Sequence, residues 1–320
     1  MQCFRTWTNY TTCMDHEKMK FVDIINLINT TFLIISLLCL LFSLTIFYTF
    51  KTLHCDRVTI HKNLFLSMSL NNVSWLMLYI ILYNIKDSFI LCRIVYSITT
   101  YFMMATYFWM LCEGIFLREL TKSVVISDFV KRSLIVLGWG GPLLVVVPYI
   151  YFKYSSENQI CWMDNGFSNL ILAVPTMVIL GLNTIILITI IITIKKKKLN
   201  FQNISRTGQS DSNSATLLNI QFLKPILILT PVLGLQFFIL PTRPVPGSYY
   251  EYMYEVISCL STSTQGISMS LLLCFCNKQI MKLLKLKIKR AKQNLTINIL
   301  SLTSQRPSSS KTSIELDTIM

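Results

Sequence analysis

Long uncharged runs separated by short charged stretches set the pattern of this chain. One run, residues 92–118, carries no charge between positions 94 and 117 except Glu113. At about 1.5 Å per residue, a helix of this length crosses a hydrocarbon core of about 30 Å. We predict further membrane-spanning helices from six comparable runs: residues 24–50, 63–85, 134–152, 166–194, 225–242 and 256–277. The predicted fold is an all-α membrane protein, with a seven-transmembrane helix bundle over residues 24–277.

Composition and charge fit a protein that crosses the membrane several times. The chain is 53% hydrophobic and 14% charged, which is too apolar for a soluble protein of 320 residues. Of its 29 Lys and Arg, 22 lie in alternate segments: 51–62, 118–133, 195–224 and after 277. Basic residues collect on the cytoplasmic side, so we predict the N-terminus outside and the tail inside. Charges interleaved with spanning helices cannot form one basic face, so no nucleic-acid partner is expected despite the net charge of +14.

The segments outside the spans have distinct compositions. Residues 1–23 are polar, lack the apolar core of a signal peptide, and contain a glycosylation sequon at Asn9. Residues 195–224 begin with four lysines and continue through a Ser-rich and Asn-rich stretch, which predicts a flexible connector. Residues 278–293 predict a basic amphipathic helix that lies on the lipid of the inner leaflet. Residues 294–320 are Ser/Thr-rich and predict a disordered cytoplasmic tail.

Two ionisable residues lie inside the predicted spans near the cytoplasmic boundary. Glu113 is five residues before Arg118 on an outside-to-inside run, and His61 is four residues after Arg57 on the opposite run. Both therefore sit about one turn inside the same boundary, and we predict that they are partners. Asn277 ends the seventh run at a similar depth and can join Arg57. The alternative is a buried polar clasp with no switching role.

Two more groups of residues interrupt the apolar pattern. Pro231 and Gly234 remove a hydrogen bond and loosen packing in the sixth run, which predicts either a hinge or a static bend. Asn71, Gln236 and Gln265 place amides toward the outer half of three helices. They predict a wet cavity open to the outside, or else a fixed hydrogen-bonded bundle.

Cysteine and histidine positions limit the chemistry. Cys92 starts the third run on the outside and Cys161 lies in the second outer loop, where an oxidising compartment lets them bridge. Cys274 and Cys276 lie at the inner boundary, where apolar packing or palmitoylation is open to them. The three histidines, at positions 16, 54 and 61, do not cluster, so we expect no metal site, cofactor or catalytic residue.

Seven stretches give the chain a resemblance to a known family. They are RTWTNYTTC at 5–13, LHCDRVTIHKNLF at 53–65, YFWMLCEGIFL at 107–117, LGWGGP at 137–142, CW at 161–162, PVLGLQFFILPTRP at 231–244, and QG at 265–266 with CFCN at 274–277. On these stretches the chain resembles the secretin-type (class B) G-protein-coupled receptors, and within them the calcitonin and calcitonin-gene-related-peptide receptors. The resemblance covers residues 5 to 285, without the central inner loop and the tail.

The resemblance implies a plasma-membrane receptor that binds a peptide hormone and activates a heterotrimeric G protein, chiefly the one that stimulates adenylyl cyclase. Some relatives also require a single-span accessory protein, which stays open for this chain. Matching positions imply a disulfide between Cys92 and Cys161. They also imply a cytoplasmic polar network of Arg57, His61, Glu113 and Asn277, central polar residues Gln236 and Gln265, and a sixth-helix hinge at Pro231 and Gly234.

The sequence departs from the family in two respects. Residues 1–23 match only the end of an extracellular hormone-binding domain of about a hundred residues, so we expect residues 1–320 alone to bind peptide weakly. The Thr and Tyr of the family's cytoplasmic network are Ile226 and Leu273 here, and a central Asn is Thr106. A non-signalling or decoy protein derived from such a receptor is therefore the alternative to a signalling receptor. A transporter is disfavoured because His61 and Glu113 are the only ionisable groups well inside the spans.

Overall fold

The computed structural model describes most of the bundle and short stretches beyond it. The described residues are 16–50, 56–84, 89–122, 126–156, 162, 168–206 and 249–275, followed by 281–282, 285–287, 289–290, 292–293 and 296. The chain divides into two compact units, Met1–Leu273 and Cys274–Met320. In the second unit, the described residues from 281 onward are helical. The amphipathic helix over 278–293 stays a prediction, as does the tail.

Among the described residues of the first unit, five helices are long and apolar enough to cross a membrane. They are α1 (His16–Thr49), α2 (Asp56–Asn84), α3 (Phe89–Lys122), α4 (Asp128–Ser156) and α5 (Asn169–Arg206). Each contains most or all of one of the first five predicted runs, so those five predictions are confirmed by length and composition. The sixth predicted run, 225–242, lies outside the described residues.

Helix ends extend beyond the uncharged runs. α2 begins at Asp56 and α4 at Asp128, and an acidic residue in the first turn is favourable at the positive end of the helix dipole. α5 continues through the four lysines to Arg206, so the prediction of a flexible connector from residue 195 is wrong for residues 195–206. Lysine is a good helix former, and the lysine run ends only the apolar stretch.

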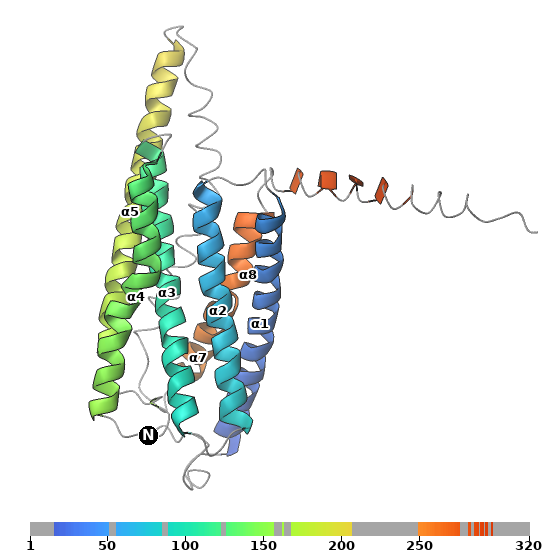
Figure 1. Ribbon diagram of the computed structural model, residues 1–320, viewed down its shortest axis with the longest axis vertical. Coiled ribbons are helices and arrows are strands. Elements are labelled where there is room, and N and C mark those ends of the chain that lie inside the picture. Colours follow the sequence, from blue (N-terminus) through green and yellow to red (C-terminus); the bar gives the residue numbers. More distant parts are fainter. Residues whose placement is uncertain are drawn as a thin grey trace, which may run out of the picture. The chain divides into compact units, whose positions relative to one another are not determined.

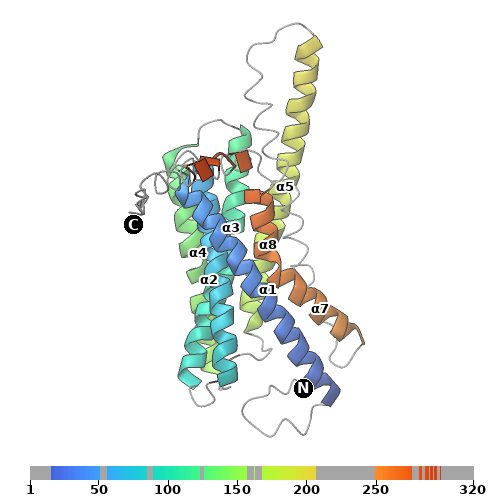
Figure 2. The same cartoon turned by 90° about the vertical axis from the view of Figure 1, so that its right-hand side faces the viewer.

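The seventh predicted run is divided. α7 (Tyr249–Ser263) starts before the run. Within the run, α7 is followed by α8 (Gln265–Ser270) and by the π-helical turn η3 (Leu271–Phe275). The backbone N–H of Thr264 still bonds to the carbonyl of Leu260 at 3.1 Å, and that of Ser268 bonds to the carbonyl of Thr264 at 3.0 Å. Hydrogen bonding therefore continues across the break from α7 into α8, although Figure 2 shows the two helices at an angle.

α3 is the central helix of the described bundle. It contacts α2, α4 and α5, and Figure 1 shows it between α2 and the α4–α5 pair. In its most apolar 18-residue window 50% of the residues are buried, against 22% for α5, so α5 is peripheral. On the other side of α2, α1 contacts α7 and α8 (Figure 2). Buried α3 side chains, including Trp109, Met104, Cys112 and Phe116, form much of the core.

Glycine allows α4 to approach α3 closely. A Cβ added at Gly138 would lie 2.4 Å from the Trp109 ring, whereas one at Gly140 would meet only a Val136 methyl at 3.9 Å. The Trp109 indole is fully buried and stacks edge-on against Trp139, with ring centroids 5.7 Å apart. Close backbone approach at small residues is typical of helix packing in membranes, where dispersion contacts replace the hydrophobic effect.

Candidate functional site

The end of the bundle where α2 begins contains a buried pair of ionisable side chains. His61 lies on α2 and Glu113 on α3, two neighbouring helices that run in opposite directions. The Nδ1 atom of His61 is 3.1 Å from the Oε2 atom of Glu113, and the side chains are only 6% and 7% exposed. The structure therefore brings together the two residues that share a predicted depth.

The contact is close but poorly aligned. The two side chains do not meet the geometry of a hydrogen bond. Within the described residues, neither oxygen of Glu113 has a hydrogen-bond partner. The Phe47 ring of α1 stacks on the His61 ring, with centroids 6.4 Å apart, and on Phe65 at 5.5 Å. These apolar surroundings strengthen the attraction between the pair, and they also make each group costly to bury without the other.

The remaining residues predicted for the cytoplasmic network are less fully described. Arg57 is half-buried on α2, one turn before His61. Leu273, in η3, is 5% exposed, so an apolar side chain is buried where the resemblance would place a tyrosine. Asn277 and Ile226 lie outside the described residues, as do the hinge residues Pro231 and Gly234. Their part in the network stays a prediction.

The central polar residues lie on separate helices. The Nε2 atom of Gln265, the first residue of α8, is 3.4 Å from the Met110 sulfur on α3. Asn71 on α2 has a buried Oδ1 atom with no hydrogen-bond partner among the described residues. Thr106 donates to the Phe102 carbonyl of its own helix at 3.0 Å rather than to another helix. Gln236 lies outside the described residues, and the wet cavity stays a prediction.

A three-helix junction was not predicted from the sequence. The Asn72 amide of α2 donates to the Ser36 hydroxyl of α1 at 3.0 Å, and both side chains are buried. A Cβ added at Gly266 of α8 would come 2.2 Å from that hydroxyl, so the three helices meet there. Asn72 is eleven residues after His61, about three helical turns, which places both on one face of α2. That spacing is the feature of the sequence that could have indicated a second buried polar contact on this face of α2.

The N-terminal end of α3 carries the predicted disulfide cysteine. Cys92 is disulfide-bonded, while Cys161 lies outside the described residues. The Arg93 guanidinium lies 5.1 Å from the centroid of the buried Trp162 ring. Trp162 has a φ of 54°, a left-handed conformation that costs energy for this residue type and persists only where the surroundings fix it. A neighbour of Cys92 thus contacts a neighbour of Cys161. Asn9 lies outside the described residues.

The buried polar contacts of the bundle restrain its helices. Within the part of the chain that the structure describes, no three His, Cys, Asp or Glu side chains gather in a way that could hold a metal ion. The buried polar contacts instead connect helices: α2 to α3 through His61 and Glu113, and α1 to α2 through Ser36 and Asn72. Such contacts can fix the relative positions of helices and can change when the helices move.

Comparison with known proteins matches this architecture. Residues 22–269 match the family described as 7 transmembrane receptor (Secretin family). The calcitonin gene-related peptide type 1 receptor of Xenopus laevis is 33% identical over 295 residues, which cover 88% of this chain and 58% of that receptor. The human calcitonin receptor is 31% identical over 296 residues, which cover 88% of this chain and 59% of the receptor. The chain thus spans a little under three fifths of the length of the curated relatives it matches.

Proposed function

Because the chain belongs to the secretin family of seven-transmembrane receptors, we propose that it is a peptide-hormone receptor that activates a heterotrimeric G protein. The matched relatives are named for calcitonin and for calcitonin gene-related peptide, so the proposed ligand is a peptide of that class. We propose that the G protein is the one that stimulates adenylyl cyclase. The apolar helices and the family place the chain in the plasma membrane as a multi-pass protein. Its family consists of receptors, not enzymes.

The buried His61–Glu113 contact is the observation that carries this proposal. A receptor needs an element with two arrangements whose balance the hormone can shift. Ionisable side chains are costly to bury in an apolar span, so they are rare there. A buried ionisable pair that joins α2 to α3 therefore favours a functional role. We propose that Arg57 and Asn277 extend this pair toward the cytoplasm, and that the sixth helix hinges at Pro231 and Gly234 when the inner face opens.

The outer half is proposed to receive the hormone. Gln265 on α8 and Asn71 on α2 are two polar side chains of the bundle, and the buried Asn71 oxygen has no hydrogen-bond partner among the described residues. We propose that these two and Gln236 line a cavity that takes the hormone's N-terminal segment. Polar groups in an otherwise apolar cavity fix the orientation of a ligand.

The outer loops are proposed to be extracellular. The Arg93–Trp162 contact supports a bridge between the adjacent Cys92 and Cys161, which would hold the second outer loop against α3. An extracellular N-terminus makes Asn9 a glycosylation site. A single-span accessory protein is a further proposed partner, and membrane lipid is the proposed partner of the helix over 278–293.

A second candidate function is a non-signalling or decoy protein derived from such a receptor. The observation that favours it is Leu273, which is buried and apolar where the family's network has a hydrogen-bonding side chain. In this candidate the outer half of the bundle binds hormone while the altered inner network does not activate the G protein.

A cyclic-AMP assay decides between the two candidates. Cells expressing the protein from its complete transcript are exposed to calcitonin-like peptides, with surface expression and labelled-peptide binding measured on the same cells. A concentration-dependent rise in cyclic AMP supports the signalling receptor. Surface protein that binds peptide without raising cyclic AMP, in cells that still respond to direct cyclase activation, supports the decoy. Surface protein that binds no peptide of this class contradicts the proposed ligand.

A further inference from the structure

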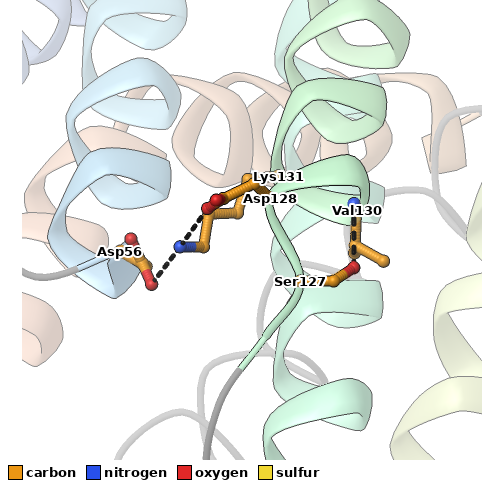
Figure 3. Close-up of polar contacts among 5 residues, drawn as sticks. All are labelled: Asp56, Ser127, Asp128, Val130 and Lys131. Carbon is orange, nitrogen blue, oxygen red and sulfur yellow. Dashed lines mark hydrogen bonds and ion pairs between the residues drawn. The ribbon is translucent and has the colours of Figure 1, made fainter.

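A lysine on α4 joins two helices at the end of the bundle where α2 begins. The Nζ atom of Lys131 is 2.7 Å from the Oδ2 atom of Asp56 and 3.0 Å from the Oδ1 atom of Asp128 (Figure 3). Asp56 is the first residue of α2, and Asp128 is the first residue of α4. The Lys131–Asp128 pair lies within one helix, whereas the Lys131–Asp56 pair ties α4 to α2.

Hydrogen bonds in the first turn of α4 fix the backbone position of Lys131. The Val130 backbone N–H donates to the Ser127 hydroxyl at 3.4 Å (Figure 3). The Lys131 backbone N–H donates to the Ser127 carbonyl at 3.3 Å. A serine at this position satisfies N–H groups that have no partner within the helix. Lys131 is thereby held one turn into α4, where its side chain is 27% exposed, against 52% for Asp56 and 83% for Asp128.

Lys131 and Asp128 lie before the uncharged run that begins at residue 134, and Asp56 lies before the run that begins at residue 63. The hydrogen bond to Asp56, followed by that to Asp128, raises the pKa of Lys131. The hydrogen bond from Lys131 lowers the pKa of Asp128. One ammonium is therefore shared by two carboxylates.

The position of Asp56 connects this cluster to the buried pair. Asp56 starts the helix that carries His61 five residues later, about one and a half turns. The same part of α2 is therefore held against α3 by the buried contact, and against α4 by the exposed ion pair and by the Trp139 indole N–H, which donates to the Asn63 Oδ1 atom at 3.1 Å. Movement of this end of α2 away from α4 must break the Lys131–Asp56 pair.

We infer that Lys131 is a positioning residue that holds the His61 end of α2 against α4 in the arrangement where His61 contacts Glu113. Loss of its pair with Asp56 loosens the first turn of α2, which the Trp139–Asn63 bond further along the helix does not reach, and raises basal signalling. The signalling part of this inference rests on the proposed receptor function, whereas the restraint on α2 does not.

The chain offers a matched control. Lys122 pairs with Glu119 at 2.8 Å, also at a spacing of three residues, near the end of α3. Both members of that pair lie on one helix, so Lys122→Gln removes a comparable exposed ion pair. Asp128→Asn removes only the contact within α4. These two variants separate loss of a surface charge from loss of the tie between helices.

Hydrogen exchange of the purified protein in lipid nanodiscs tests the restraint. We expect Lys131→Gln and Asp56→Asn each to speed amide exchange about two- to fivefold in the first turns of both α2 and α4, the range expected for an exposed ion pair. Lys122→Gln should leave both turns unchanged, and Asp128→Asn should leave α2 unchanged. Exchange that is unaltered in α2 with Lys131→Gln would overturn the inference.

A charge exchange and a signalling measurement complete the test. The variant Asp56→Lys, Lys131→Asp and Asp128→Asn restores an opposite pair, and the third change prevents two acids from facing each other three residues apart. We expect it to return both exchange and basal cyclic AMP to the parent level, after a two- to fivefold rise with Lys131→Gln at matched surface expression. If the parent signals but Lys131→Gln leaves basal cyclic AMP unchanged, the positioning role is wrong. If the parent does not signal, the receptor proposal fails and hydrogen exchange alone decides the restraint.

Discussion

The His61–Glu113 pair yields the sharpest prediction about signalling. We expect Glu113→Gln, which keeps the shape of the side chain and removes its charge, to weaken the contact between α2 and α3 and to raise basal cyclic AMP. The two atoms are 3.1 Å apart, and both side chains are more than nine-tenths buried. In the proposed receptor this contact breaks when the bundle opens, so a weaker contact favours the open state.

The size of the effect follows from the environment and the geometry of the pair. Breaking a buried ion pair in a soluble protein costs about 3–5 kcal/mol, but polar contacts between membrane helices average about 0.6 kcal/mol and reach about 1.7 kcal/mol. The poor alignment of this contact favours the lower range. A change of 0.6 to 1.7 kcal/mol multiplies a small open population by about 3 to about 18.

A double-mutant cycle isolates the contact from other effects of each substitution. Basal cyclic AMP is measured at matched surface expression for the parent, His61→Ala, Glu113→Gln and the double variant, with Lys122→Gln as a control for charge loss. We expect the double variant to exceed either single variant by little, because each single change already breaks the same contact. Effects that add to within about 0.3–0.5 kcal/mol would show that the two residues are not coupled and would refute the reasoning.

Three further predictions concern the altered network, the packing of α4 and the outer loop. The double change Ile226→Thr and Leu273→Tyr should lower basal cyclic AMP roughly tenfold by restoring two interhelical bonds, and an unchanged basal level would contradict a weakened network. Gly138→Ala should lower the free energy of unfolding of the purified protein by about 1–3 kcal/mol, because its Cβ would lie 2.4 Å from the Trp109 indole. Gly140→Ala should not lower it, and equal melting temperatures of the two variants would argue against the close approach at Gly138. Cys161→Ser should sharply reduce folded surface protein or peptide response, and normal surface staining with a normal peptide response would remove the bridge.

The sequence predicts the spans well because the membrane imposes a simple rule. A run of uncharged residues long enough to cross hydrocarbon must be helical, since every backbone group needs a partner within the segment. The same rule does not fix where a helix ends. Lys195 and the residues after it leave the apolar region but still favour helix, so α5 continues to Arg206. The division at Thr264 likewise has no strong breaker in the sequence, because neither glycine nor proline occupies that position.

The candidate site was predictable where depth alone determines contact. His61 and Glu113 are ionisable and share a depth on adjacent antiparallel helices, which was enough to pair them. Ser36 and Asn72 are common polar residues, and their contact depends on which faces of α1 and α2 meet. Likewise, Lys131 pairs with Asp56 because the first turn of α4 lies beside the start of α2, a tertiary arrangement that hydropathy does not contain.

One face of α3 connects the middle of the bundle to the end where α2 begins. Thr106, Met110 and Glu113 lie four and three residues apart, so their side chains follow one another along the same side of the helix. Met110 receives the amide of Gln265 from α8, and Glu113 receives the imidazole of His61 from α2 one turn further in. An α-helix is stiff over a single turn, so α3 cannot shift at Met110 and stay fixed at Glu113. Displacement of Gln265 by a ligand would therefore act on the same segment of α3 that holds the buried pair, whether the displacement is a shift or a rotation of that helix.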